Sequence, residues 1–71
     1  MDAKELERAV AALLKTEPAQ RRCVFLRRYF YLEDVAEIAQ YYSLTTANVR
    51  MMLSRTRQKL KKYLTEGGYS L

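Results

Sequence analysis

Residues that end helices are almost absent from this chain. Its 71 residues include two glycines and one proline, and neither residue type occurs between Pro18 and Gly67. Leu, Ala, Lys, Arg and Glu, which favour helices, make up about half of the sequence. Hairpins need turn residues that this chain lacks, and a chain of this length builds one small core. We therefore predict a single small all-α domain of four helices over residues 1–71, without a wing.

Hydrophobic periodicity outlines the first two helices. The apolar side of the helix predicted over residues 2–15 carries Leu6, Val10, Leu13 and Leu14. A second helix follows Thr16-Glu17-Pro18, which offers an N-cap and a proline early in the helix, and it is predicted to end near residue 31. The lone Cys23 is interpreted as an inert packing residue. Five aromatic residues are interpreted as core with hydroxyls at its rim: Tyr29, Phe30, Tyr31, Tyr41 and Tyr42.

The next two helices have the spacing of a helix-turn-helix, over about residues 34–64. Asp34 and Glu37 have the spacing of a capping box at the start of the third helix, which should end near Tyr42. Ser43 and Leu44 then form a tight connection. A threonine, Thr45 or Thr46, caps a fourth helix that meets no breaker before Gly67-Gly68. Many such turns carry glycine where Ser43 stands, so either a left-handed backbone there costs about 1 kcal/mol or the turn differs slightly.

The fourth helix divides into an apolar and a cationic side. Residues predicted to face the core are Val49, Met52, Leu53, Thr56, Leu60, Tyr63 and Leu64. Those predicted to face outward or sideways are Ala47, Asn48, Arg50, Met51, Ser54, Arg55, Gln58, Lys61 and Lys62, and no acidic residue occurs between Val49 and Thr65. Small polar residues at its start would let this helix approach base edges in the major groove closely. A solvated basic side on an ordinary bundle helix would show the same pattern, so both interpretations stay open here.

Composition narrows the classes of function. The net charge of +5 and its concentration after Asp34, where six basic and two acidic residues lie, suit a polyanionic partner. One cysteine and no histidine leave no disulfide and no metal site of the usual zinc type. We expect no cofactor, no small-molecule substrate and no enzyme activity, because no glycine-rich phosphate loop or nucleophile with a base partner occurs. No apolar run reaches the length of a membrane span, so we expect a cytoplasmic protein without membrane contact.

Three segments in order resemble region 4 of sigma factors, particularly the extracytoplasmic-function type. They are the helix ending Leu26-Arg27-Arg28-Tyr29-Phe30, the element Val35-Ala36-Glu37-Ile38-Ala39, and the run from Asn48 to Leu60. The resemblance covers Pro18 to Tyr69, about three quarters of the chain. Leu32 and Glu33 depart from the glycine and apolar residue that the family usually has there, and Met51 replaces a residue that is more often small or polar.

The resemblance implies a domain that reads the −35 promoter element in duplex DNA and docks on the flap of the RNA polymerase beta subunit. Residues carried over as groove or base contacts are Thr45, Thr46, Ala47, Asn48, Arg50 and Met51. Residues carried over as phosphate contacts are Ser54, Arg55 and Lys59. Met51 could contact a thymine methyl in place of a hydrogen bond. An anti-sigma factor is a further partner that the resemblance allows.

A sigma factor also needs region 2, for which this chain has no counterpart. The chain is then either the C-terminal part of a longer sigma factor, which we favour, or a small stand-alone relative. Two other functions stay open. One is an interaction module that binds an anti-sigma factor or the flap through apolar surfaces, without specific DNA binding. The other is a stand-alone helix-turn-helix regulator that dimerises on symmetric operators.

Overall fold

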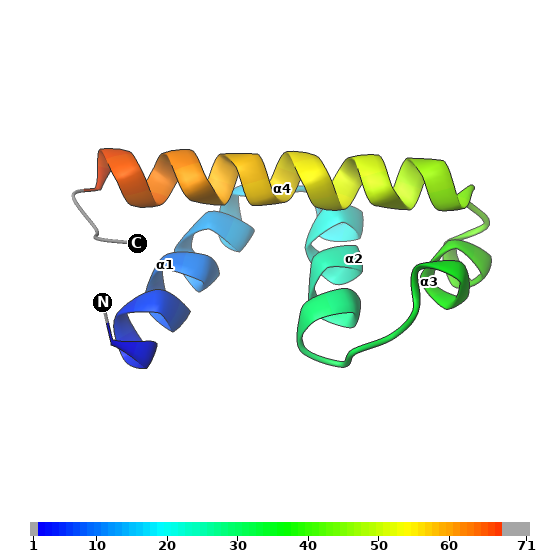
Figure 1. Ribbon diagram of the computed structural model, residues 1–71, viewed down its shortest axis with the longest axis horizontal. Helices are drawn as coiled ribbons and strands as arrows, with labels where there is room; N and C mark the ends of the chain where they lie inside the picture. Colours follow the sequence, from blue (N-terminus) through cyan, green and yellow to red (C-terminus); the bar gives the residue numbers. More distant parts are fainter. Residues whose placement is uncertain (1, 68–71) are drawn as a thin grey trace.

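Four helices account for most of the chain in the computed structural model, which describes residues 2–67 (Figure 1). They are α1 (Ala3–Thr16), α2 (Ala19–Tyr29), α3 (Val35–Tyr42) and α4 (Thr46–Glu66). No strand occurs among the described residues. The prediction of a small all-α domain with a C-terminal helix-turn-helix is confirmed. Gly68, predicted to help end the last helix, and Tyr69, at the end of the resemblance, lie outside the described residues.

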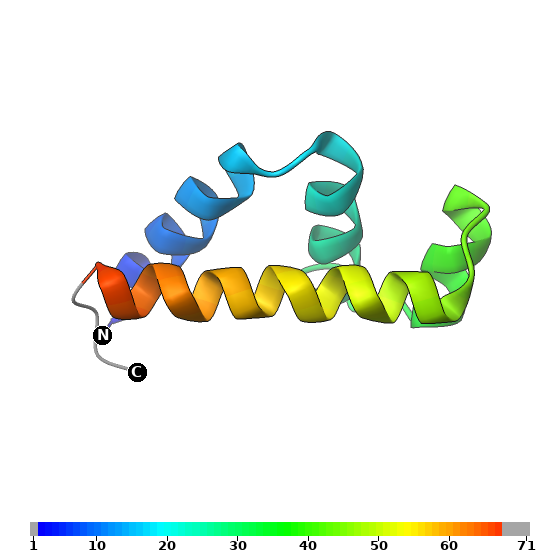
Figure 2. The same cartoon turned by 90° about the horizontal axis from the view of Figure 1, so that it is seen from above.

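Helix α4 is the member against which the others pack. It contacts α1, α2 and α3, and the 37 Å long dimension of the domain follows its axis. Figures 1 and 2, viewed 90° apart, both place α1, α2 and α3 along the same side of α4. The opposite side of α4 is therefore left uncovered along its length.

The core lies where α2, α3 and α4 meet. Val24, Ile38 and Val49, one from each of these helices, are its largest fully buried side chains. Leu14 of α1 joins the same cluster, together with Phe25, Ala39 and Leu53. The predicted inward side of α4 is confirmed at Val49, Leu53, Thr56 and Leu64, which are buried, and at Met52 and Leu60, which are partly buried. The prediction is wrong at Tyr63, which is exposed near the end of α4. Leu6, predicted on the apolar side of the first helix, is also exposed.

The helix starts differ from those predicted in two places. Asp34 occupies the N-cap position of α3, but its side chain makes no capping hydrogen bond, so the predicted capping box with Glu37 is not formed. Thr16 is the last residue of α1, and its hydroxyl donates to the Leu13 carbonyl oxygen at 2.6 Å. Pro18 holds the N-cap position of α2 without a side-chain hydrogen bond. Thr16 therefore ends one helix and does not cap the next.

The aromatic residues predicted as core are mostly exposed. Helix α2 ends at Tyr29, and the following Phe30, Tyr31 and Leu32 are 58%, 74% and 77% exposed. Leu32 has a left-handed backbone with φ of 56° in the connection to α3. Tyr29 and Tyr41 are also exposed, and only Tyr42 is half-buried. Cys23, predicted as a packing residue, is exposed as well.

Candidate nucleic-acid interface

The turn between α3 and α4 is closed by backbone hydrogen bonds. Ser43 is left-handed with φ of 56° and ψ of 41°, and its N–H donates to the Gln40 carbonyl oxygen at 3.3 Å. The N–H of Leu44 donates to the Ala39 carbonyl oxygen at 2.8 Å, and the Leu44 side chain packs against the core. This is a Schellman motif, which usually carries glycine at the left-handed position. Of the two alternatives at Ser43, the structure has the left-handed backbone, and α4 leaves α3 in a fixed direction.

The first turn of α4 presents small or polar residues to solvent. Thr45 is its N-cap, and the hydroxyl oxygen accepts a hydrogen bond from the Asn48 N–H at 3.0 Å. Thr46, Ala47 and Asn48 are exposed. All four were predicted as groove contacts, and they lie together at the start of α4, next to the turn. The cap uses only the hydroxyl oxygen of Thr45 and the backbone N–H of Asn48. The hydroxyl hydrogen of Thr45 and the side-chain amide of Asn48 can therefore still bond to a ligand.

The predicted contacts farther along α4 are not equally available. Arg50, Met51 and Arg55 are exposed, and Ser54 is half-buried. The ammonium nitrogen of Lys59 lies 3.1 Å and 3.2 Å from the two carboxylate oxygens of Glu17. A phosphate would have to compete with that carboxylate for Lys59.

Glu17 was not singled out in the sequence, yet it is a buried carboxylate. Its side chain is 3% exposed, and the Arg21 guanidinium lies 3.9 Å away. Oxygen Oε2 accepts a hydrogen bond from Lys59, whereas Oε1 is close to the ammonium but not aligned for one. The ion pair ties the connection between α1 and α2 to α4. Sequence carried little sign of it, because the two residues are 42 positions apart.

Arg57 is a cationic residue of α4 that the predicted contact set left out. It is exposed, and its guanidinium donates a hydrogen bond to the Tyr29 hydroxyl of α2. Arg57 follows Arg50 by seven residues, which is close to two helical turns, so both lie on nearly the same side of α4. That spacing was visible in the sequence and could have placed Arg57 among the candidates. The contact with Tyr29 holds the guanidinium in one place at the surface.

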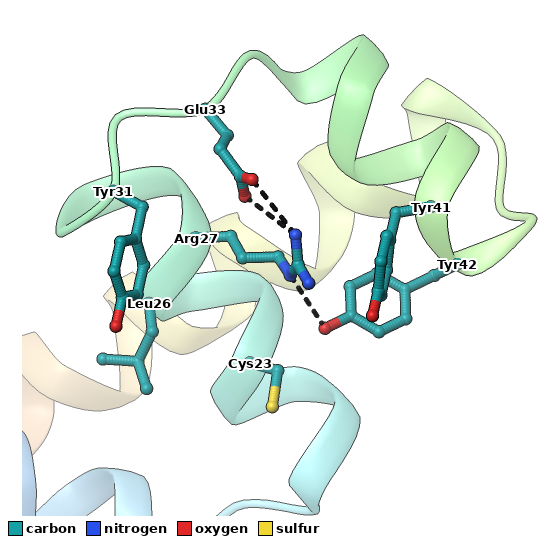
Figure 3. A pocket seen from close by; sticks show the side chains of 7 residues that line it. All are labelled: Cys23, Leu26, Arg27, Tyr31, Glu33, Tyr41 and Tyr42. Carbon is teal, nitrogen blue, oxygen red and sulfur yellow. Dashed lines mark hydrogen bonds and ion pairs between the residues drawn. The ribbon is translucent and has the colours of Figure 1, made fainter.

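A groove of about 580 Å³ opens between α2 and α3, away from the outward side of α4 (Figure 3). It is lined by Cys23, Leu26, Arg27, Tyr31, Glu33, Tyr41 and Tyr42. The Arg27 guanidinium donates to the Tyr42 hydroxyl at 3.2 Å and to Glu33 at 3.1 Å and 3.3 Å. The hydrogen bond to Tyr42, and then the nearby Glu33 charge, raise the pKa of Arg27 above its ordinary value, so this residue stays charged.

Residues 2–67 contain no candidate metal site, because no three histidine, cysteine or acidic side chains gather there in a way that could hold a metal ion. In the same part of the chain, every helix is too short or too polar to cross a membrane.

Comparison with known proteins identifies the family. The family model described as sigma-70, region 4, matches residues 3–60, which span α1 and reach well into α4. No curated protein and no solved structure matches the chain. The matched residues include the whole of the turn and the first turn of α4. The chain therefore belongs to the sigma-70 region 4 family, whose domains bind promoter DNA and RNA polymerase and are not enzymes.

Proposed function

We propose that this domain reads the −35 element of a promoter by placing the N-terminal half of α4 in the major groove. The observation that carries the proposal is the first turn of α4, which is capped, exposed and built from residues that are small or polar. It lies on a helix whose outer side is not covered by α1, α2 or α3 (Figure 2). A helix about 10–12 Å across fits into the major groove. Because its outer side is uncovered, α4 can enter the groove while the other helices stay packed behind it.

Each groove residue has a chemistry suited to base edges. Asn48 can pair with adenine, Arg50 with guanine, and the methyl groups of Met51 and Ala47 with the methyl of thymine. Thr45 and Thr46 supply hydroxyls that bond to a phosphate or a base at the mouth of the groove. These six residues form the proposed reading surface: Thr45, Thr46, Ala47, Asn48, Arg50 and Met51.

Phosphate contacts flank the reading surface. We assign Arg55 and the half-buried Ser54 to this role, as the sequence predicted, and add Arg57, whose position Tyr29 fixes. Lys59 would contact a phosphate only by giving up its ion pair with Glu17. Cationic contacts of this kind supply affinity and orientation but little sequence preference.

The exposed residues Phe30, Tyr31, Leu32 and Tyr41 form what we call the docking patch. Tyr31 and Tyr41 line the same groove between α2 and α3, and Phe30 and Leu32 flank Tyr31 in the chain. A contiguous exposed apolar surface marks a site that binds another protein. We propose that the docking patch binds the flap of the RNA polymerase beta subunit, and that an anti-sigma factor would compete for it. This separates polymerase contact, on α3 and the connection that precedes it, from DNA contact, on α4.

We also propose that the chain is of the extracytoplasmic-function type, which the three segments described in the sequence resemble. Because promoter opening needs a region 2, we propose that these residues serve as the C-terminal domain of a longer sigma factor. Such a protein would act in the cytoplasm, where the polymerase and promoter are.

The test is a selection from a randomised duplex library at two salt concentrations, with and without a flap fragment. We expect a short non-palindromic motif and an affinity that falls with salt, with a log-log slope of about −0.9 per phosphate contacted. Arg50→Ala should cost about 1–3 kcal/mol of base discrimination, whereas Lys61→Ala, on the same helix, should weaken all duplexes alike.

Three results would redirect the proposal. A palindromic motif would indicate a dimeric regulator. Flap binding without salt-sensitive DNA binding would indicate an interaction module. Equal, sequence-independent losses in Arg50→Ala and Lys61→Ala would contradict the assignment of Arg50 to the groove.

A further inference from the structure

We propose that Arg27 is a positioning residue for DNA reading, which sets how sharply the domain distinguishes one duplex sequence from another without touching DNA. The inference rests on the proposed function of α4 as the reading helix. It concerns a residue of α2 that the proposed contacts with DNA do not include.

The Arg27 side chain bridges three segments (Figure 3). Its Nε donates to the Tyr42 hydroxyl at 3.2 Å, and its Nη1 donates to both oxygens of Glu33. The guanidinium also lies 3.8 Å from the centre of the Tyr41 ring, within the range of a cation–π contact. One side chain of α2 thus holds the connection that precedes α3 and the last turn of α3.

Backbone contacts show that the connection is held at the same place. The Glu33 N–H donates to the Arg27 carbonyl oxygen at 2.9 Å. The Glu33 carbonyl oxygen accepts from the Arg28 guanidinium at 3.1 Å. Leu32, which precedes Glu33, has a left-handed backbone that an L-residue disfavours. Its surroundings must therefore hold it in place, and the bonds of Glu33 to Arg27 and Arg28 do so.

Helix α3 depends on these contacts because it has few other means of orientation. It has eight residues, its N-cap Asp34 makes no side-chain hydrogen bond, and it fully buries only Ile38 and Ala39, while Val35 and Tyr42 are partly buried against the core. Packing through so few apolar side chains leaves a short helix some freedom to rotate and tilt. The polar contacts of Arg27 at both ends of α3 supply the missing constraint.

The orientation of α3 passes to the reading surface through a short turn. Tyr42, bonded to Arg27, is directly followed by Ser43 and then by Leu44 and Thr45, where α4 is capped. Hydrogen bonds to base edges tolerate little displacement, whereas attraction between arginine and phosphate falls slowly with distance. Loosening α3 should therefore reduce base discrimination more than it reduces affinity for DNA of any sequence.

The experiment measures a ratio of two affinities in the whole domain. For each variant, the Kd for a random duplex is divided by the Kd for the duplex that the wild-type domain selects. We expect Arg27→Gln to lower this ratio by about five- to tenfold. Tyr42→Phe, which keeps the ring, should lower it by about threefold. These magnitudes are those expected for the loss of partly exposed hydrogen bonds to a charged group. The matched control is Arg22→Gln, which removes the same charge from the same helix.

The outcomes separate the two proposals. A ratio in Arg27→Gln equal to that in Arg22→Gln, with both variants folded by circular dichroism, would overturn the positioning role. If Arg27→Gln does not fold, Tyr42→Phe decides, since it removes one hydroxyl from a half-buried ring. A wild-type domain that selects no duplex at all would refute the reading function itself. Supporting evidence would be a non-additive ratio in the double variant Arg27→Gln, Tyr42→Phe.

Discussion

The ion pair between the buried Glu17 carboxylate and the half-exposed Lys59 should contribute measurably to the stability of the domain. The Glu17 side chain is 3% exposed, so it depends on its cationic neighbours for stabilisation, whereas that of Lys59 is 50% exposed. Lys59→Met keeps the length and apolar stem of the side chain but removes its charge. The carboxylate then loses its nearest partner while staying buried.

The expected loss lies below that of a fully buried pair. Removing one partner from such a pair costs about 3–5 kcal/mol. Here water reaches Lys59, and the Arg21 guanidinium 3.9 Å from Glu17 compensates part of the charge. We therefore expect Lys59→Met to lower the free energy of unfolding by about 1.5–2.5 kcal/mol, which lowers the Tm of a domain this small by about 6–20 °C.

The assay is thermal and urea unfolding followed by circular dichroism at 222 nm, which is a helix signal. Lys62→Met is the matched control, because Lys62 pairs with Glu66 at 3.9 Å on the same helix and both side chains are largely exposed. That exposed pair should contribute less than about 0.5 kcal/mol. The double variant Glu17→Gln, Lys59→Met should recover most of the loss, since no charge is then left buried.

Equal stability of Lys59→Met and Lys62→Met would refute this reasoning. It would mean that the Glu17 carboxylate gains nothing from Lys59 beyond what solvent supplies. In that case Lys59 would be free to contact phosphate, and its substitution should instead reduce the salt dependence of DNA binding by about one phosphate contact.

Two predictions concern the ends of α3 and α4. Thr45→Ala should cost about 1 kcal/mol because it removes the cap of α4, while Asp34→Ala should cost much less because that side chain makes no capping bond; similar losses in urea unfolding would contradict the assigned caps. Ser43→Gly should raise stability by about 0.5–1 kcal/mol, since glycine relieves a left-handed backbone at some cost in chain entropy. A lower Tm for Ser43→Gly than for the wild type would show that Ser43 makes a contact whose contribution outweighs the cost of its left-handed backbone.

The sequence predicted the parts of the fold that depend on short-range patterns. The end of α3 at Tyr42, a threonine cap at the start of α4 and the buried side of α4 around Leu53 all follow from residues within two turns of one another. Periodicity says which residues share a side, but not whether another helix covers that side. Tyr31 therefore looked like core, although its helix ends two residues earlier and nothing packs over it.

The candidate site was predictable to a similar extent. The role of the residues at the start of α4 was predicted from the spacing of the helix-turn-helix, and these residues lie together as expected. Contacts between distant positions, such as Lys59 with Glu17 or Arg27 with Tyr42, left no local pattern. They depend on how the helices pack, which hydrophobic periodicity alone does not determine.

Helix α4 combines the central place in the core with the reading surface, and this has a consequence for how such domains diverge. Its inward and outward residues are different positions of one helix, so each set can vary without the other. Exposed positions tolerate most replacements within about 0.5 kcal/mol. A lineage can therefore acquire a new target sequence by drift at a few outward sites, while selection on the hydrophobic side keeps the fold unchanged.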